Sequence, residues 1–304
     1  MDLDHRLRVR GHRRDPGAHT AVGLPHLRAV GTVAVGERRF VIVTGGSSGI
    51  GLATARAFAA RGDHIALMAR DAGRLADAAK RCEEARGSGD QRVVWRSVDL
   101  SDHAATEAAF RDLAQSGFVP DVLVNSAGVI IPGEFATMSA EDFSANHTCG
   151  FWSVVNPCRA AVPGMIERRR GHILNVSSVA GYLGIYGYTG YSSAKFATMG
   201  FTEALRFELK PHGVRVSVVC PPDTDTPALE AEKRLRPRAT DVIAGNIKPI
   251  APEKVAAAIV RAVDSGTYLV IPDALSAFYF RLKGLLPEVF FAIVDGDVRK
   301  ALRD

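Results

Sequence analysis

The sequence predicts an α/β fold in which one doubly wound parallel sheet carries helices on both faces. Short apolar runs alternate with helical patterns along most of the chain, a glycine-rich turn directly follows the first run, and no linker or internal repeat interrupts the alternation. The composition agrees, because 47% hydrophobic and 23% charged residues among 304 are typical of a globular protein with a large core.

The apolar runs define the predicted strands, and helical patterns fill the intervals between them. Strands are expected at 40–44, 65–69, 93–98, 122–125, 172–178, 214–220 and 268–271. Helices are expected at 52–61, 75–86, 104–117, 140 to about 166, 191–210 and 252–263. The polar, proline-bounded stretch 228–248 follows a late strand, and we expect it to form a mobile lid beside a ligand crevice.

The positive charge of the chain is concentrated at its N-terminus. Residues 1–39 hold eight Arg, no Lys and four Asp or Glu, so about +4 of the formal +5 lies there. The nearly neutral remainder argues against a nucleic-acid-binding face. Residues 1–39 lack sustained periodicity and the apolar core of a secretory signal, which predicts a disordered leader. A transit peptide and a wrongly assigned start codon remain alternatives.

The C-terminal extension, residues 273–304, is rich in apolar side chains at 274–294 but has no run of 18 consecutive apolar residues, so no transmembrane helix is predicted. A packed helix pair, a dimer contact and a peripheral membrane element all remain open. The four cysteines have no metal-binding or disulfide spacing. They predict free thiols in a reducing compartment, no metal site and a cytoplasmic protein, associated at most with a membrane surface.

A glycine-rich turn, Gly45-Gly46-Ser47-Ser48-Gly49-Ile50-Gly51, lies between the first predicted strand and the first helix. In this order the glycines let the backbone approach a ligand, and the helix N-terminus favours a phosphate group. The sequence therefore predicts a dinucleotide site in a Rossmann fold. A tight turn without a ligand is the alternative.

Two arginines follow the second predicted strand, where an acidic residue would hold a free ribose 2′-hydroxyl. Arg70 ends that strand and Arg74 lies one helical turn later. Because two guanidinium groups suit a 2′-phosphate, the pair predicts NADPH rather than NADH. The alternative is a solvated arginine pair at the start of a helix.

Further polar residues lie at strand ends or within helices. Asp99, followed by Leu100, suits either the adenine amino group or a helix cap. Asn125-Ser126-Ala127-Gly128 ends the fourth predicted strand with small residues that allow close passage beside a cofactor. Asn146 lies within a predicted helix, where a buried amide needs hydrogen-bonding partners.

Tyr191 and Lys195 are four residues apart at the start of a predicted helix, so their side chains share one face. A nearby ammonium can lower the pKa of a phenol, ordinarily ~10, by roughly 1 to 3 units. Tyr191 is therefore a candidate general acid, and Ser178 at the preceding strand end could hold a substrate oxygen with it. The alternative is a half-buried tyrosine beside a solvated lysine.

These motifs together resemble the short-chain dehydrogenase/reductase family from about residue 40 to 271, so 40–272 is expected to be an NADP-binding catalytic domain. Thr44 to Gly51 is similar to its cofactor loop, and 125–128 to its Asn-Asn-Ala-Gly motif with Ser126 in place of Asn. The resemblance implies a catalytic tetrad and a homo-oligomer, a dimer or tetramer. The implied tetrad is Asn146, Ser178, Tyr191 and Lys195. The implied cofactor-binding residues are Gly45, Ser47, Ser48, Gly49, Ile50, Gly51, Arg70, Arg74, Asp99, Leu100, Asn125, Ala127, Gly128, Tyr191, Lys195, Pro221, Thr224 and Thr226.

Two loops, 178–191 and Pro221-Pro-Asp-Thr-Asp-Thr-Pro227, resemble those of the 3-ketodihydrosphingosine reductase branch, which reduces 3-dehydrosphinganine to sphinganine with NADPH. The implied activity is reduction of a lipophilic ketone to a secondary alcohol. Other substrates of 3-oxoacyl, steroid or retinoid type remain open. A noncatalytic NADP-sensing protein on the same fold is the alternative from another class.

Overall fold

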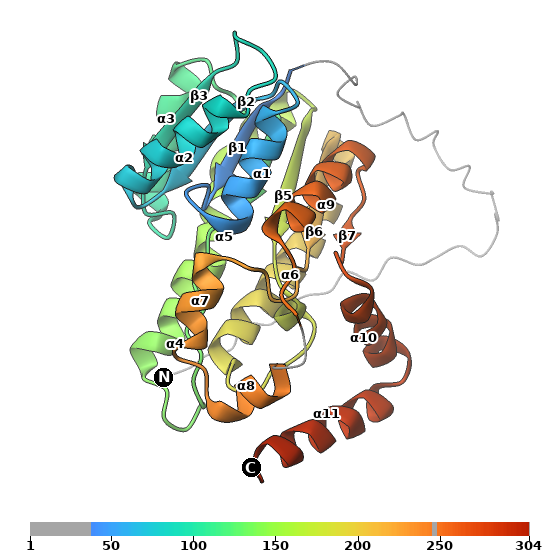
Figure 1. The fold of residues 1–304 in the computed structure, drawn as a ribbon. Coiled ribbons are helices and arrows are strands. Elements are labelled where there is room, and N and C mark those ends of the chain that lie inside the picture. The colour runs from blue at the N-terminus through green and yellow to red at the C-terminus, as the bar shows by residue number, and fades with distance from the viewer. Residues whose placement is uncertain (1–37, 245–247, 304) are drawn as a thin grey trace, which may run out of the picture.

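The computed structural model describes residues 38–244 and 248–303, and these form one seven-stranded sheet (Figure 1). All neighbouring strands are parallel, in the order β3-β2-β1-β4-β5-β6-β7. The strands are β1 Phe40–Thr44, β2 His64–Ala69, β3 Val93–Ser97, β4 Val122–Asn125, β5 Gly171–Val176, β6 Val214–Val219 and β7 Leu269–Val270. The predicted doubly wound sheet is confirmed.

Helices cover both faces of this sheet (Figure 1). They are α1 Gly49–Ala59, α2 Ala72–Glu84, α3 His103–Gln115, α4 Ala140–His147, α5 Ser153–Glu167, α6 Thr189–Leu209, α7 Pro227–Lys233, α8 Arg238–Ala244, α9 Pro252–Ser265, α10 Ala274–Leu285 and α11 Pro287–Ala301. Buried side chains of α1, α2 and α9 form one apolar layer with the strands. Those of α3, α5 and α6 form the other.

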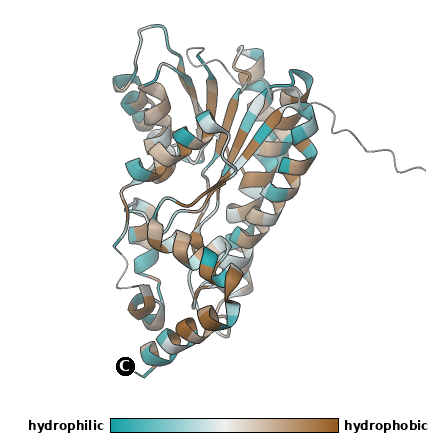
Figure 2. Cartoon of the chain, turned by 90° about the vertical axis from the view of Figure 1, so that its right-hand side faces the viewer, coloured by the Kyte–Doolittle hydropathy of each residue, from teal (hydrophilic) through white to brown (hydrophobic). Residues whose placement is uncertain are grey.

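The central strands are apolar on both sides because both layers pack against them. Val41 and Val43 of β1 lie in one layer, Ile42 lies in the other, and all three are fully buried. Figure 2 shows the hydrophobic colour concentrated on the strands. This burial explains why unbroken apolar runs predicted the strands correctly.

Two helices near the glycine-rich turn begin earlier than predicted. Helix α1 begins at Gly49, inside the glycine motif, where Ser48 is its N-cap in an extended conformation. Helix α2 begins at Ala72 because Asp71 caps it by accepting a hydrogen bond from the Arg74 backbone N–H at 3.0 Å. Both helix N-termini consequently lie nearer the strand ends than the sequence predicted.

The single helix predicted from residue 140 to about 166 is wrong. A π-helical segment, Thr148–Trp152, separates α4 from α5. Because a π-helical turn holds more residues than an α-helical turn, the side chains after it face another direction than in a continuous α-helix. Cys149 and Ser153 of this region lie in the wall of a cavity. Apolar periodicity alone does not register such an inserted turn.

Arg38 and Arg39 precede the predicted boundary at residue 40 and belong to the described structure. Arg39 is buried, and its guanidinium donates hydrogen bonds to Asp63 at 2.8 and 3.0 Å and to Asp264 at 2.9 Å. Charge-assisted bonds of this kind compensate for the burial of the arginine. Residues 1–37 of the predicted leader lie outside the described residues.

The predicted lid is helical, and the C-terminal extension is a helix pair. Stretch 228–248 contains most of α7 and all of α8, with residues 245–247 outside the described part. Helices α10 and α11 pack against each other, and Phe290 of α11 belongs to the same buried cluster as Tyr182 and Leu183 of the segment after β5. The helix pair that the sequence left open, beside a dimer contact and a membrane element, is therefore present, and the other two alternatives stay predictions. No helix in the described ranges is long and apolar enough to cross a bilayer.

Candidate active site

A cavity of about 680 Å³ lies where the strands of the sheet end. Its wall includes residues that directly follow four strands, and Pro221, which lies two residues after β6. The four are Gly45 after β1, Arg70 after β2, Ser126 after β4 and Ser177 after β5. Parallel strands direct their carboxyl ends to one edge, and ligands bind at that edge in open α/β sheets. The fold therefore gathers residues that are distant in sequence into one site.

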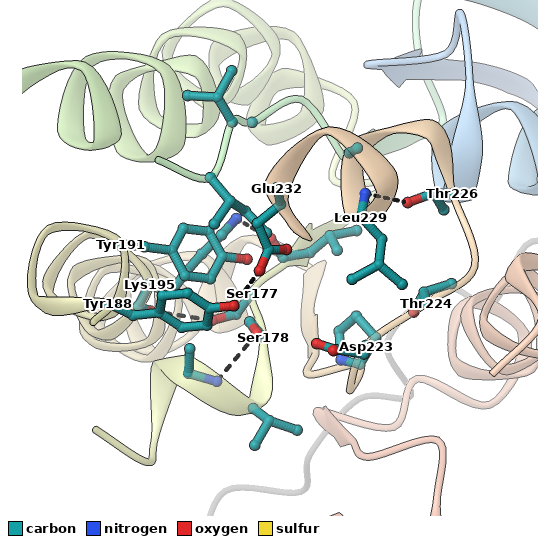
Figure 3. A pocket seen from close by; sticks show the side chains of 18 of the residues that line it. Ser177, Ser178, Tyr188, Tyr191, Lys195, Asp223, Thr224, Thr226, Leu229 and Glu232 are labelled. Carbon is teal, nitrogen blue, oxygen red and sulfur yellow. Dashed lines mark hydrogen bonds between the residues drawn. The ribbon is translucent and has the colours of Figure 1, made fainter. Parts of the chain in front are cut away.

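The structure brings Ser178, Tyr191 and Lys195 together in this cavity (Figure 3). Ser178 caps a short 3₁₀ turn after β5 and accepts a hydrogen bond from the Ala180 backbone N–H at 3.1 Å. Its hydroxyl also faces the Tyr191 phenol closely enough to lower the pKa of that group. Ser177 differs, because its hydroxyl is buried and donates to the Lys195 carbonyl oxygen at 3.1 Å. The geometry favours Ser178 over Ser177 as the substrate-facing serine.

The charge state of Tyr191 differs from the prediction. Burial raises the pKa of Tyr191 more than its hydrogen bond with Ser178 lowers it, and the carboxylates of Glu232 and Asp223 raise it further. The predicted lowering of this pKa by Lys195 is therefore wrong for this geometry. The Lys195 ammonium lies 5.7 Å from the Tyr191 ring centre and donates to the Val176 carbonyl oxygen at 3.1 Å. Tyr191 is a protonated phenol, the state that a proton donor requires.

Burial also governs Lys195. The side chain is almost fully enclosed, and desolvation lowers the pKa of its ammonium to about 8. The lysine thus carries its charge at neutral pH and loses it only under mildly alkaline conditions.

Asn146, the remaining member of the implied tetrad, does not line the cavity. It is fully buried, and its side-chain oxygen accepts from the Ile131 N–H at 3.1 Å while its nitrogen donates to the carbonyl oxygens of Ile131 and Asp142. These partners satisfy the amide, as the sequence required. The side chain lies against Gly190, next to Tyr191, so it supports the start of α6.

Asn125 is likewise set apart from the other predicted cofactor residues. It is fully buried, and its side-chain nitrogen donates to Asn175 at 2.9 Å. All the remaining predicted cofactor residues line the cavity. Those residues are Gly45, Ser47, Ser48, Gly49, Ile50, Gly51, Arg70, Arg74, Asp99, Leu100, Ala127, Gly128, Tyr191, Lys195, Pro221, Thr224 and Thr226.

The N-terminus of α1 has the features of an anion site. Its first turn contains no acidic residue, and Ser48 forms no side-chain cap bond, so backbone N–H groups remain for a ligand. A Cβ at Gly51 would lie 2.3 Å from the Gly45 carbonyl oxygen, which shows how closely the turn folds on itself. Residues here fit the pyrophosphate of a dinucleotide.

Arg70 and Arg74 lie exposed at the cavity edge, and no ion pair engages either guanidinium within the described residues. They fit a 2′-phosphate. Asp99 accepts hydrogen bonds from the N–H and hydroxyl of Ser101, which keeps the pKa of its carboxyl low. Its side chain thus organises the turn that leads to α3.

Sequence reasoning missed a second polar group of the cavity and one of its walls. The polar group is Tyr188, Asp223, Glu232 and Arg236, and the wall from the C-terminal helices includes Tyr279, Phe290 and Val294. The spacing of four between Glu232 and Arg236 was the only signal for the first, and such pairs are usually solvated. Nothing in the sequence indicated that the C-terminal helices face the site.

Comparison with known proteins agrees with this geometry. The family described as short chain dehydrogenase matches residues 39–236. A 3-ketodihydrosphingosine reductase of Bos taurus is 39% identical over 229 residues, which are 75% of this chain and 69% of that protein.

Solved structures resemble the chain over most of its length. Levodione reductase is 26% identical with a TM-score of 0.73, and the match covers 79% of this chain and 98% of that one. A short-chain dehydrogenase from Sphingobium yanoikuyae, solved in complex with NADPH, is 25% identical with a TM-score of 0.67. That match covers 87% of this chain and 94% of the other. The chain therefore is an oxidoreductase that belongs to the short-chain dehydrogenase family.

Proposed function

We propose that the protein reduces 3-dehydrosphinganine, also named 3-ketodihydrosphingosine, to sphinganine with NADPH. The relative from Bos taurus carries this activity in its name. The observation that carries the proposal is the convergence of Ser178, Tyr191 and Lys195 in a cavity that also holds the α1 N-terminus and two arginines. The overall change joins ketone, NADPH and a proton to give the alcohol and NADP⁺.

Ser178 and Tyr191 divide the work at the carbonyl oxygen. When bound, NADPH supplies the hydride that reduces the carbonyl carbon. The two hydroxyls hold the carbonyl oxygen, and Tyr191 transfers its phenolic proton to that oxygen as negative charge develops there. The Lys195 ammonium, whose pKa of about 8 keeps it charged at neutral pH, stabilises the phenolate that forms.

Specific cavity residues fit the rest of each ligand. Arg70 and Arg74 fit the 2′-phosphate that distinguishes NADPH, and Thr224 and Thr226 line the same cavity after β6. The apolar side chains of Tyr279, Phe290 and Val294 offer a surface for an alkyl chain.

A ketone panel with the purified protein tests the proposal. NADPH consumption with sphinganine formation is expected for 3-dehydrosphinganine, and weaker turnover for 3-oxoacyl, steroid and retinoid-type ketones. Robust turnover of one of those ketones without turnover of 3-dehydrosphinganine would reject the assigned substrate. Binding of NADPH without turnover of any ketone would favour the NADP-sensing alternative.

Contact with a membrane surface through 274–294, a homo-oligomer and a cytoplasmic location remain predictions. Large apolar side chains stay exposed on α10 and α11, among them Phe278 at 55% and Leu285 at 78%. Such exposure suits either a second copy of the chain or a lipid surface.

A further inference from the structure

A buried charged cluster lies beside Tyr191, and the proton transfer does not use it. Glu232 of α7 is 2% exposed, and its Oε1 accepts hydrogen bonds from the Tyr188 hydroxyl and, at 2.6 Å, from Arg236 Nε. Arg236 also donates to Asp223 Oδ2 at 2.8 Å. All four residues line the cavity, and Figure 3 shows Glu232 and Asp223 facing the space beside Tyr191 and Ser178.

The cluster carries an unbalanced charge. Two carboxylates, Asp223 and Glu232, share the single guanidinium of Arg236, which leaves one negative charge. Within the described residues, Oε2 of Glu232 receives no hydrogen bond. Lys195, the cation nearest Tyr191 on α6, donates to the Val176 carbonyl oxygen and pairs with neither carboxylate. Because burying unbalanced charge is costly, such a cluster favours a cationic ligand.

The cluster is also correctly placed relative to the reacting group. The Tyr188 ring stands edge-on to the Tyr191 ring with 5.9 Å between centres, and the Tyr188 hydroxyl binds Glu232. The carboxylate is thus bonded to the residue that packs against the proton donor, and Figure 3 draws it beside Tyr191. In 3-dehydrosphinganine the amine is bonded to the carbon next to the ketone, so its ammonium must lie near the oxygen that Tyr191 holds.

We propose that Glu232, assisted by Asp223, binds the ammonium group of the substrate and selects α-amino ketones over neutral ketones. The inference rests on the proposed function and names the part of the cavity that determines substrate choice. Asp223 belongs to the loop 221–227, one of the two loops that resemble the 3-ketodihydrosphingosine reductase branch.

The test compares two shortened-chain ketones, one with the free amine of 3-dehydrosphinganine and one that lacks it. Wild type should reduce the amino ketone with the higher kcat/KM. Glu232→Gln keeps the side-chain shape and an acceptor for Tyr188 but removes the charge. It should lower kcat/KM for the amino ketone roughly 10- to 100-fold, mainly through KM, and should affect the neutral ketone far less, through kcat, because Glu232 also raises the pKa of Tyr191.

Glu230→Gln is the matched control, because Glu230 lies on the same helix but is exposed and pairs with Lys233 at 3.0 Å. Glu230→Gln should change kcat/KM for neither ketone. Unchanged affinity for NADPH would show that Glu232→Gln is folded. As a second measurement, sphinganine should inhibit wild type more strongly than N-acetylsphinganine does, and Glu232→Gln should abolish that difference.

The outcomes separate this inference from the proposed function. Equal losses on both ketones in Glu232→Gln would assign Glu232 a structural role in holding α7 to Tyr188 and overturn the inference, while the reductase assignment stands. No turnover of the amino ketone by wild type would overturn the proposed function and the inference with it.

Discussion

The Lys195 ammonium lies 5.7 Å from the centre of the Tyr191 ring and donates its hydrogen bond to the Val176 carbonyl oxygen, not to the phenol. The pair shares one face of α6, as the spacing of four requires, yet burial dominates both side chains. It raises the pKa of Tyr191 and lowers that of Lys195 to about 8. The tyrosine therefore holds its proton, and the lysine holds its charge, at neutral pH.

The rate of ketone reduction should follow the charge of Lys195. Below the pKa of about 8 both groups are protonated, so the single-turnover rate constant should be nearly independent of pH. Above this pKa Lys195 loses the charge that stabilises the phenolate, and the rate constant should fall. A pH profile of single-turnover reduction measures this directly. A rate that rises through this pKa would contradict the assigned roles.

Lys195 should also lower the stability of the protein at neutral pH. Its pKa is about 8 when folded and 10.5 for a free side chain. The unfolded chain binds more protons between these values, so the contribution of Lys195 to stability improves as pH rises through that window. Lys195→Met lacks this pH dependence. The unfolding free energy of the variant minus that of wild type should therefore fall by about 3 kcal/mol as the pH rises from below 8 to above 10.5. Denaturant titrations at several pH values would show a constant difference if the lysine were not desolvated.

Arg70 should contribute to the choice of NADPH over NADH. Arg70→Ala is expected to raise KM for NADPH roughly 10- to 100-fold, because a charge-assisted bond to the 2′-phosphate is lost, and to leave KM for NADH unchanged. Arg81→Ala, on the exposed surface of α2 and outside the cavity, is the control. Equal effects on both cofactors would argue against a 2′-phosphate contact.

Gly51 should tolerate no side chain. The Cβ of Gly51→Ala would lie 2.3 Å from the Gly45 carbonyl oxygen, so the turn must shift and NADPH binding should be lost or severely weakened. Gly200→Ala on α6 meets nothing within 4 Å and should be neutral or stabilise the protein by about 0.5–1 kcal/mol. Calorimetric titration with NADPH measures the affinity of each variant, which should be lost in Gly51→Ala and unchanged in Gly200→Ala. Normal binding by Gly51→Ala would show that the turn is not a close-packed cradle.

The sequence predicted the parts of this protein that depend on local pattern. Unbroken apolar runs marked the strands because both sheet faces are covered, and Gly45, Ser178 and Tyr191 stood in motifs tied to strand ends. The place of Glu232 in the cavity could not be predicted, because its burial depends on how α7 packs against Tyr188 in the folded protein. The raised pKa of Tyr191 had the same origin, since tertiary enclosure, not the spacing to Lys195, sets it. The C-terminal wall depends on how α11 returns to the cavity, which no local pattern records.

Tyr191→Phe tests the central claim most directly, because it removes the proton donor and leaves the ring in place. In a single-turnover assay with 3-dehydrosphinganine and saturating NADPH, the rate should fall roughly 10²- to 10⁴-fold while NADPH affinity stays the same. Sphinganine formation at close to the wild-type rate would contradict the account.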